Sequence, residues 1–312
     1  MAKLQGVIAA AATPLGPDLS IDHGRLVEHC RFLLAEGGCD GINLLGTTGE
    51  ATSFSAEARV GAMRAIARSG LPLDRFMVGT GAAALDDAVR LTAEAKALGF
   101  AGALLLPPFY YKGIDAEGLV AYVEAVISRA GSDGLPLYLY HFPQNSGVPY
   151  TIEVVARLRE RNEKVVLGLK DSSGDLDYSA ALAKRLPGFA VFPSAEGALG
   201  RAKELGFAGC ISATANVTGP FAQRAWSASG AAAGEGLAQA VAIRTAIAQF
   251  PLVAAVKASL ALLTGVTAWR RVMPPLTALT DEQLGGLERA LSATALMAHR
   301  GTDTAARRAR SG

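Results

Sequence analysis

A lysine stands where an apolar run ends, in the stretch LGLKDSSGD over residues 167–175. The residues before Lys170 predict a buried strand, and the Asp-Ser-Ser-Gly that follows predicts a turn. Burial favours the neutral form of an amine, and a neutral amine can attack a carbonyl carbon to form an imine, which then serves as an electron sink. Lys170 therefore indicates Schiff-base chemistry or, as the structural alternative, an ion pair with a neighbouring carboxylate.

Two other stretches place hydroxyl groups where apolar runs end. Tyr140 closes the run that precedes the lysine, and its phenol can relay protons if another hydroxyl holds its proton; the alternative is a core tyrosine. The stretch GTTGE (46–50) supplies two threonines and backbone N–H groups, which suit a carboxylate or another small anion. It lacks the ending of a P-loop, and a plain capped turn is its alternative interpretation.

Three consecutive aromatic residues, FYY at 109–111, follow another apolar run. Such a group either packs beneath its own loop or crosses to a partner subunit, because large aromatic surfaces rarely stay in water. The four histidines show no metal-ligand spacing, so we predict no metal site.

Apolar runs alternate along the chain with amphipathic segments. The runs cover residues 6–14, 41–46, 76–80, 102–108, 136–143, 165–170, 189–195 and 209–214. Helices are expected at 21–36, 55–68, 86–98, 115–130, 151–162, 175–186, 198–206 and 216–229. Unbroken apolar runs are typical of parallel strands covered on both faces, and eight such units predict a (β/α)8 TIM barrel. The competing doubly wound sheet would need a glycine-rich turn that the TPLGPDLS stretch lacks.

The domain organisation follows from this pattern. Residues 1–230 are expected to form the barrel with the active site at the carboxyl ends of its strands, and 231–300 a C-terminal helical region. The small, polar and basic stretch 301–312 is predicted to be a disordered tail.

Composition excludes several classes of protein. Half of the 312 residues are hydrophobic, and the formal net charge of +2 gives no general attraction to nucleic acid or to anionic membranes. Three cysteines without a CxxC pair favour the reducing cytoplasm. The apolar start is interpreted as a first strand rather than a signal peptide, and no run reaches the roughly 18 apolar residues of a membrane span.

Taken together, the motifs resemble those of the dihydrodipicolinate synthase / N-acetylneuraminate lyase family of class I, pyruvate-dependent aldolases. The matching stretches are GTTGE (46–50), PPFYY (107–111), YHFP (140–143), GLKDSSGD (168–175) and GCISATANV (209–217). The resemblance implies a Schiff-base enzyme that needs no cofactor. It also implies a homotetramer built as a dimer of dimers.

The resemblance also implies roles for individual residues. Lys170 matches the Schiff-base lysine and Tyr140 the central proton-shuttling tyrosine, with Thr47 as its hydrogen-bond partner. Thr48 matches the clamp on the 2-oxo acid carboxylate, together with nearby backbone amides. Tyr111 matches a tyrosine that enters the active site of a neighbouring subunit.

The substrate-binding residues depart from the family pattern. Ile211 matches the position whose backbone carbonyl faces the bound keto acid. Asn145 stands where dihydrodipicolinate synthases carry a carboxylate-binding arginine, and an amide cannot form that bidentate clamp. Of the lyases' acidic pair, only Glu196 is present. Asn145, Gln144 and Ser194 favour a hydroxylated, sugar-acid-like or 4-hydroxy-2-oxo acid substrate.

We therefore predict a lyase that makes or breaks a C–C bond between pyruvate, or another 2-oxo acid, and an aldehyde, and that is not a strict dihydrodipicolinate synthase. Within the same chemistry, the alternatives are that synthase itself or a sugar-acid dehydratase. A non-catalytic 2-oxo acid-binding protein is the alternative of another class. A pyridoxal phosphate enzyme is disfavoured because no convincing phosphate loop is present.

Overall fold

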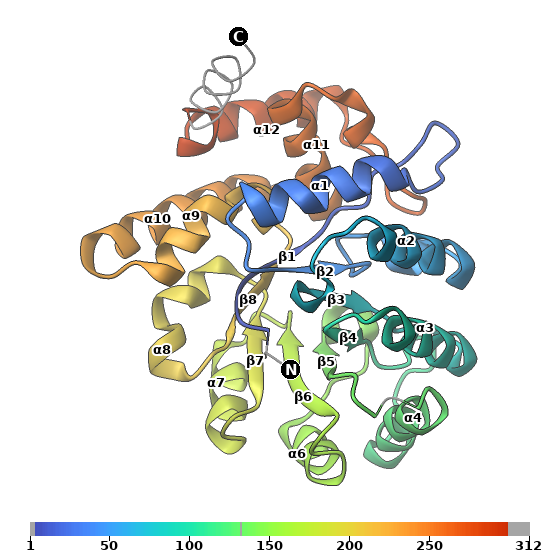
Figure 1. Cartoon of the computed structure of the whole chain (residues 1–312). Helices are drawn as coiled ribbons and strands as arrows, with labels where there is room; N and C mark the ends of the chain where they lie inside the picture. Colours follow the sequence, from blue (N-terminus) through green and yellow to red (C-terminus); the bar gives the residue numbers. More distant parts are fainter. Residues whose placement is uncertain (1–3, 132, 299–312) are drawn as a thin grey trace.

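The computed structural model describes residues 4–131 and 133–298, which form a ring of parallel strands surrounded by helices (Figure 1). The strands are β1 (Gly6–Ala10), β2 (Gly41–Leu44), β3 (Phe76–Gly79), β4 (Gly102–Leu105), β5 (Leu137–His141), β6 (Val166–Asp171), β7 (Ala190–Pro193) and β8 (Gly209–Ser212). Each pairs in parallel with its neighbours in the order β7-β6-β5-β4-β3-β2-β1-β8. A 2.9 Å hydrogen bond from the Ala208 N–H to the Val191 carbonyl links the two ends. The predicted TIM barrel is confirmed.

The helices between the strands match the predicted ranges to within two residues at each end, with one exception. They are α1 (His23–Ala35), α2 (Ala56–Arg68), α3 (Leu85–Leu98), α4 (Ala116–Arg129), α6 (Ile152–Arg161), α7 (Leu176–Arg185) and α9 (Ala215–Ser227). The single helix expected at 198–206 is wrong. The structure has a 3₁₀ helix, η3 (Glu196–Arg201), followed by the short α8 (Ala202–Leu205). Two glycines, Gly197 and Gly200, weaken an α-helix at that point.

The strands begin within one residue of the predicted starts but mostly end earlier than predicted. β1 stops at Ala10, whereas the apolar run continues to Pro14. Ala11 still donates a 3.0 Å hydrogen bond to the Asn43 carbonyl of β2, but Ala12 and Thr13 are buried without strand pairing. β6 is the exception and continues one residue past Lys170 to Asp171. At the carboxyl ends of the strands, apolar composition therefore indicates that a residue is buried, not that its backbone is paired with a neighbouring strand.

Two apolar layers hold the barrel together. The inner cluster fills the barrel interior, and the outer cluster lies between the strands and the helices. The buried members of the inner cluster are Leu4, Ile8, Ala10, Met77, Leu104, Tyr138, Tyr140, Ala190, Phe192 and Ile211. Side chains alternate between the two layers along each strand, so the same alternation decides which residues can reach an active site at the barrel mouth.

The C-terminal helical region consists of α10 (Gly230–Ile247), α11 (Leu252–Thr264) and α12 (Asp281–Ser292), with a 3₁₀ turn, η4 (Thr267–Arg270), between the last two. α10 packs along α9, and α11 and α12 continue from it beyond α1 in Figure 1. Buried residues of all three helices, including Ile243, Val256 and Leu287, join the outer apolar cluster of the barrel. The predicted tail at 301–312 lies outside the described residues.

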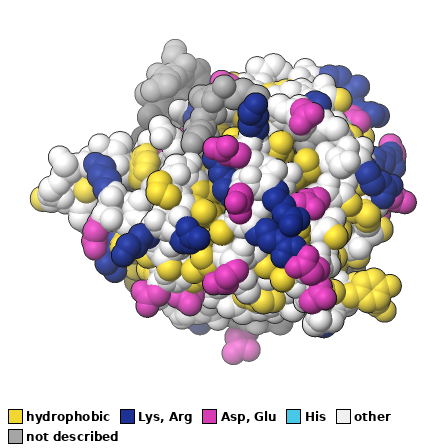
Figure 2. Space-filling model, turned by 90° about the horizontal axis from the view of Figure 1, so that it is seen from below, with side chains coloured by type: hydrophobic (Ala, Val, Ile, Leu, Met, Phe, Trp, Pro, Cys, Tyr) yellow, Lys and Arg dark blue, Asp and Glu magenta, His cyan; other side chains and the backbone are white. Residues whose placement is uncertain are grey.

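Two surface properties bear on the predicted partners. On the face shown in Figure 2, basic and acidic side chains are interspersed, as expected from the small net charge. Within the described residues no single helix is long and apolar enough to cross a membrane. The pair α10 and α11 passes that test together but is bent by 112° at its break.

Candidate active site

The site is built at the carboxyl ends of neighbouring strands. Tyr140 on β5 and Lys170 on β6 are paired positions in the sheet. Both side chains are only 3% exposed. The Lys170 Nζ lies 4.5 Å from the centroid of the Tyr140 ring. The structure thus brings together the two residues that head the sequence analysis, and it does so because consecutive strands of a barrel are neighbours.

The surroundings of Lys170 bear on its two alternative interpretations. None of the salt bridges formed within residues 4–131 and 133–298 involves Lys170. The adjacent carboxylate, Asp171, accepts hydrogen bonds from the Ser179 hydroxyl at 2.7 Å and the Ser173 N–H at 2.8 Å. The ion-pair interpretation of Lys170 therefore finds no support in the geometry.

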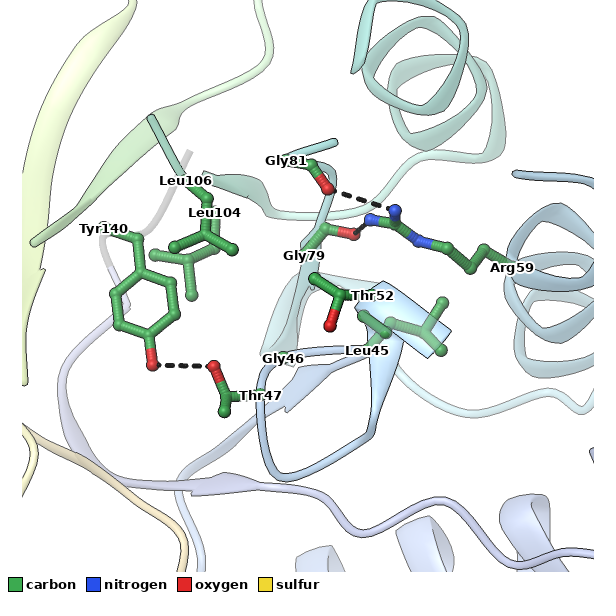
Figure 3. A pocket seen from close by; sticks show the side chains of 11 residues that line it. Leu45, Gly46, Thr47, Thr52, Arg59, Gly79, Gly81, Leu104, Leu106 and Tyr140 are labelled. Carbon is green, nitrogen blue, oxygen red and sulfur yellow. Dashed lines mark hydrogen bonds between the residues drawn. The ribbon is translucent and has the colours of Figure 1, made fainter. Parts of the chain in front are cut away.

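The Tyr140 hydroxyl lies within reach of two other hydroxyl groups. Its oxygen is 3.1 Å from Thr47 Oγ1 (Figure 3) and 3.5 Å from Ser172 Oγ. Burial alone would raise the pKa of Tyr140, but the positive charge of Lys170 and the hydrogen bonds with Ser172 and Thr47 together lower it below 10.0. The result is a phenol that gives up its proton more readily than a free tyrosine.

The sequence does not identify Ser172 as a site residue, although it lies two positions after Lys170. The Asp-Ser-Ser-Gly motif predicts a turn, and the direction of a turn side chain does not follow from its residue type. The available signal was position: a residue two places after Lys170 on a strand that ends at Asp171 stays at the barrel mouth.

The GTTGE turn carries Thr47 and Thr48 over the barrel mouth. Leu45 and Glu50, on either side of it, have left-handed backbone conformations with φ of 52° and 57°. Such conformations are costly for residues other than glycine and persist only when the surroundings impose them. Thr48 is buried, and the Thr13 hydroxyl donates a 2.8 Å hydrogen bond to the Gly49 carbonyl. The surrounding contacts therefore fix the conformation of the turn.

A small cavity lies beside Tyr140, between the ends of β2, β3 and β4. Figure 3 shows Thr47 and Thr52 beside it, with Leu104 and Leu106 near Tyr140. Arg59, on its far side, donates hydrogen bonds to the Gly79 carbonyl at 2.8 Å and the Gly81 carbonyl at 3.0 Å. Burial lowers the pKa of this guanidinium to about 10. Arg59 thus ties α2 to the end of β3.

The remaining predicted substrate-binding residues lie at the carboxyl ends of other strands. Ile211 is fully buried on β8, in the inner cluster. Ser194 is half-buried immediately after β7, and Asn145 is exposed on the short helix α5 (Pro143–Ser146) that follows β5. All three therefore lie at the same end of the barrel as Lys170.

Tyr111 does not pack beneath its own loop. Its side chain is 70% exposed and that of Tyr110 is 74% exposed. Their rings meet edge to face, with centroids 5.4 Å apart. The Lys112 ammonium donates a 2.7 Å hydrogen bond to the Ser146 carbonyl, which fixes the loop against α5. Tyr110 and Tyr111 thus do not follow the first of the two predicted arrangements, and contact with a partner subunit stays a prediction.

Glu196 is fully buried and its carboxylate is already occupied. One oxygen accepts hydrogen bonds from the hydroxyls of Ser212, Thr214 and Thr218 at 2.9, 2.7 and 2.6 Å. The other lies 3.2 Å from Arg244 Nη1 on α10. Glu196 therefore braces the ends of β7 and β8 and does not present a carboxylate to a substrate. Within the described residues, no group of three or more His, Cys, Asp or Glu side chains could hold a metal ion.

Comparison with known proteins gives consistent matches over most of the chain. A model of the dihydrodipicolinate synthetase family matches residues 3–294. A protein of Chloroflexus aurantiacus named as an uncharacterized DapA-like lyase is 34% identical over 299 residues, which cover 93% of this chain and 97% of the relative. A 4-hydroxy-tetrahydrodipicolinate synthase of Stenotrophomonas maltophilia is 35% identical over 219 residues, covering 69% and 70% of the two chains. The crystal structure of dihydrodipicolinate synthase from Agrobacterium tumefaciens is similar with a TM-score of 0.86 and 31% identity, over 93% of this chain and 99% of that one.

Proposed function

The chain belongs to the dihydrodipicolinate synthetase family and is a lyase, and we propose that it joins pyruvate and an aldehyde, or cleaves their product, through an imine on Lys170. One observation carries this proposal. Lys170 is buried, has no carboxylate partner in the part of the chain that the structure describes, and faces a tyrosine whose hydroxyl is held by a threonine. An amine in such a place is suited to attack a carbonyl rather than to hold a structural charge.

The proposed reaction begins with attack of the Lys170 Nζ on C2 of pyruvate. Water leaves to give the protonated imine, and loss of a proton from C3 gives an enamine. The enamine carbon attacks the carbonyl carbon of the aldehyde, the new alkoxide takes up a proton, and hydrolysis releases the product. The same steps in reverse cleave a 4-hydroxy-2-oxo acid. The imine is itself the electron sink, so the mechanism needs no organic cofactor or metal.

Proton transfers in this scheme belong to Tyr140, whose hydroxyl is hydrogen-bonded to Thr47. The lowered pKa of Tyr140 supports that role, because a relay residue must release and regain its proton near the working pH. Tyr111 is proposed to complete the relay from a neighbouring subunit of a homotetramer, and its 70% exposure supports a role outside its own chain. Thr48 and the amides of the turn hold the pyruvate carboxylate.

The aldehyde is proposed to be hydroxylated rather than carboxylated. Ile211 offers a backbone carbonyl to the keto acid, and Asn145 and Ser194 offer neutral hydrogen-bonding groups at the rim. With Asn145 in place of an arginine, the rim lacks the bidentate cation that recognises a carboxylate. Dihydrodipicolinate synthase activity and sugar-acid dehydration remain the alternatives within the same imine chemistry.

The cell compartment is part of the proposal. Cys30, Cys39 and Cys210 are all buried free thiols, and burial raises the pKa of each. Three unpaired cysteines in one core support a reducing compartment, and we place the enzyme in the cytoplasm.

Borohydride trapping tests the imine directly. The protein is incubated with pyruvate, reduced, digested and examined by mass spectrometry for a lactyl-type adduct on the Lys170 peptide. The Lys170→Ala variant should fold, remain unmodified and lose turnover, whereas Lys184→Ala, at an exposed lysine of α7, should behave as wild type. An adduct on another lysine, or appreciable turnover by Lys170→Ala, would contradict the mechanism. Saturable pyruvate binding without an adduct would favour the non-catalytic binding protein.

A further inference from the structure

The turn that carries Thr47 and Thr48 ends on a buried ion pair with the C-terminal helices. Glu50 Oε1 lies 2.5 Å from the Nζ of Lys257, in the middle of α11, and both side chains are fully buried. The other carboxylate oxygen of Glu50 accepts a 2.6 Å hydrogen bond from the Met273 N–H, in the segment after η4. One carboxylate therefore connects the turn to two parts of the C-terminal region.

A buried ion pair joins two elements at a large cost in desolvation free energy. Removing both charges from water costs several kcal/mol, and a well-packed apolar pair of similar volume is often equally stable or more so. Burial lowers the pKa of Lys257, although the neighbouring Glu50 carboxylate opposes that effect. An ion pair differs from an apolar contact in being directional, since it fixes where the carboxylate must lie. That property matters where a backbone is held in a strained conformation.

The strain is present at the same residue. Glu50 has a left-handed backbone with φ of 57°, and Leu45 at the other side of the turn has φ of 52°. The turn is held at Gly49 by the Thr13 hydroxyl and at Glu50 by Lys257 and Met273. Thr47, whose hydroxyl holds the Tyr140 phenol at 3.1 Å, is three residues from Glu50.

We propose that Glu50 and Lys257 are positioning residues for the reaction: their ion pair holds the 46–50 turn so that Thr47 stays on the Tyr140 hydroxyl and Thr48 stays in place for the substrate carboxylate. This inference rests on the function proposed above. It makes the C-terminal helical region part of the frame of the active site, through a contact between residues 207 positions apart. A distortion of the turn by a few tenths of an ångström weakens a hydrogen bond without unfolding the barrel.

The test uses variants that distinguish an effect on the position of the 46–50 turn from an effect on the stability of the fold. Glu50→Gln or Lys257→Met alone leaves one buried charge uncompensated and is expected to lower the unfolding temperature. The double variant Glu50→Gln/Lys257→Met removes both charges. It is expected to unfold much closer to the wild type, yet to show a tenfold or greater loss of kcat, a higher pyruvate KM and a displacement to higher pH of the limb over which kcat rises with pH. Lys257→Arg keeps the charge and should recover part of the activity.

Ser259→Ala is the matched control, because Ser259 is buried on the same helix and its hydroxyl donates to the Ala255 carbonyl within that helix. It should change stability without moving the pH–rate profile. A double variant with the wild-type kcat and profile would overturn the inference. If the double variant does not fold, Glu50→Gln decides instead, assayed below its unfolding temperature: an unaltered KM and profile in that variant also overturn the inference. Absence of a borohydride adduct in the wild type would instead refute the proposed function, so the two failures are distinguishable.

Discussion

Replacing Thr47 with valine tests the proton relay at its best-defined contact. Valine has the shape of threonine but cannot hydrogen-bond, so the change removes the 3.1 Å contact with the Tyr140 hydroxyl and leaves the packing of the turn nearly intact. The pKa of Tyr140 is lowered partly by this hydrogen bond, and its loss must raise that pKa.

The size of the effect follows from the charge on the tyrosinate. A hydrogen bond to a charged group contributes about 1.5–3 kcal/mol, and each pH unit corresponds to about 1.36 kcal/mol. The pKa of Tyr140 should therefore rise by about 1–2 pH units. At a fixed pH below the pKa, each unit by which the pKa rises lowers the fraction of tyrosinate tenfold. We expect kcat at a fixed neutral pH to fall by about ten- to a hundredfold and to recover at higher pH.

The assay is the pH dependence of kcat with saturating pyruvate and the best aldehyde from a screen. Thr48→Val is the control: it should raise the pyruvate KM and leave unchanged the limb over which kcat rises with pH. Ser172→Ala should move the limb less than Thr47→Val, because its 3.5 Å contact with Tyr140 is long. If Thr47→Val leaves unchanged the limb over which kcat rises with pH, the assignment of Tyr140 as the relay is refuted.

Three further outcomes are expected. Asn145→Arg should raise kcat/KM for aspartate semialdehyde tenfold or more in a coupled assay. No gain would show that another residue binds the carboxylate of that aldehyde. Tyr111→Phe should lower kcat by about a hundredfold, and assemblies mixed from Tyr111→Phe and Lys170→Ala chains should regain activity, which they would not if Tyr111 acted within its own chain. His29, whose pKa burial lowers from 6.5 to about 4, binds a proton more readily in the unfolded chain, so stability should fall as the pH drops from about 6.5 towards about 4. The loss is worth about 3 kcal/mol in denaturant titrations and should largely disappear in His29→Gln, because each pH unit corresponds to about 1.36 kcal/mol.

The parts of the site that sequence could predict are those fixed by the order of the strands. Tyr140 and Lys170 end consecutive apolar runs, and parallel neighbours in a barrel must present their ends together. The GTTGE stretch could be placed at the same end by the same rule. Its left-handed residues, Leu45 and Glu50, carry no composition signal, because neither leucine nor glutamate favours that conformation.

Long-range polar contacts were beyond the reach of the sequence. In the sequence, Glu196 is only the one present member of the lyases' acidic pair, and nothing local to it reveals that Thr218 and Arg244 will occupy its carboxylate. The pairing of Glu50 with Lys257 spans 207 positions, and Lys257 lies in a helix whose alanines and leucines predict only burial. Side-chain hydrogen bonds of this kind depend on the completed packing, which hydrophobic periodicity does not encode.

The two buried lysines among the described residues, Lys170 and Lys257, support opposite roles by their surroundings. Lys257 is fully buried and has a carboxylate at 2.5 Å, so its charge is needed where it lies and the amine is not available as a nucleophile. Lys170 is 3% exposed, forms no ion pair within the described residues and faces an aromatic ring at 4.5 Å. A reaction at Lys257 would leave the Glu50 carboxylate buried and unpaired, whereas no carboxylate of the described residues depends on Lys170. Burial by itself therefore does not identify a reactive lysine, and the absence of a counter-charge is the feature that separates Lys170 from Lys257.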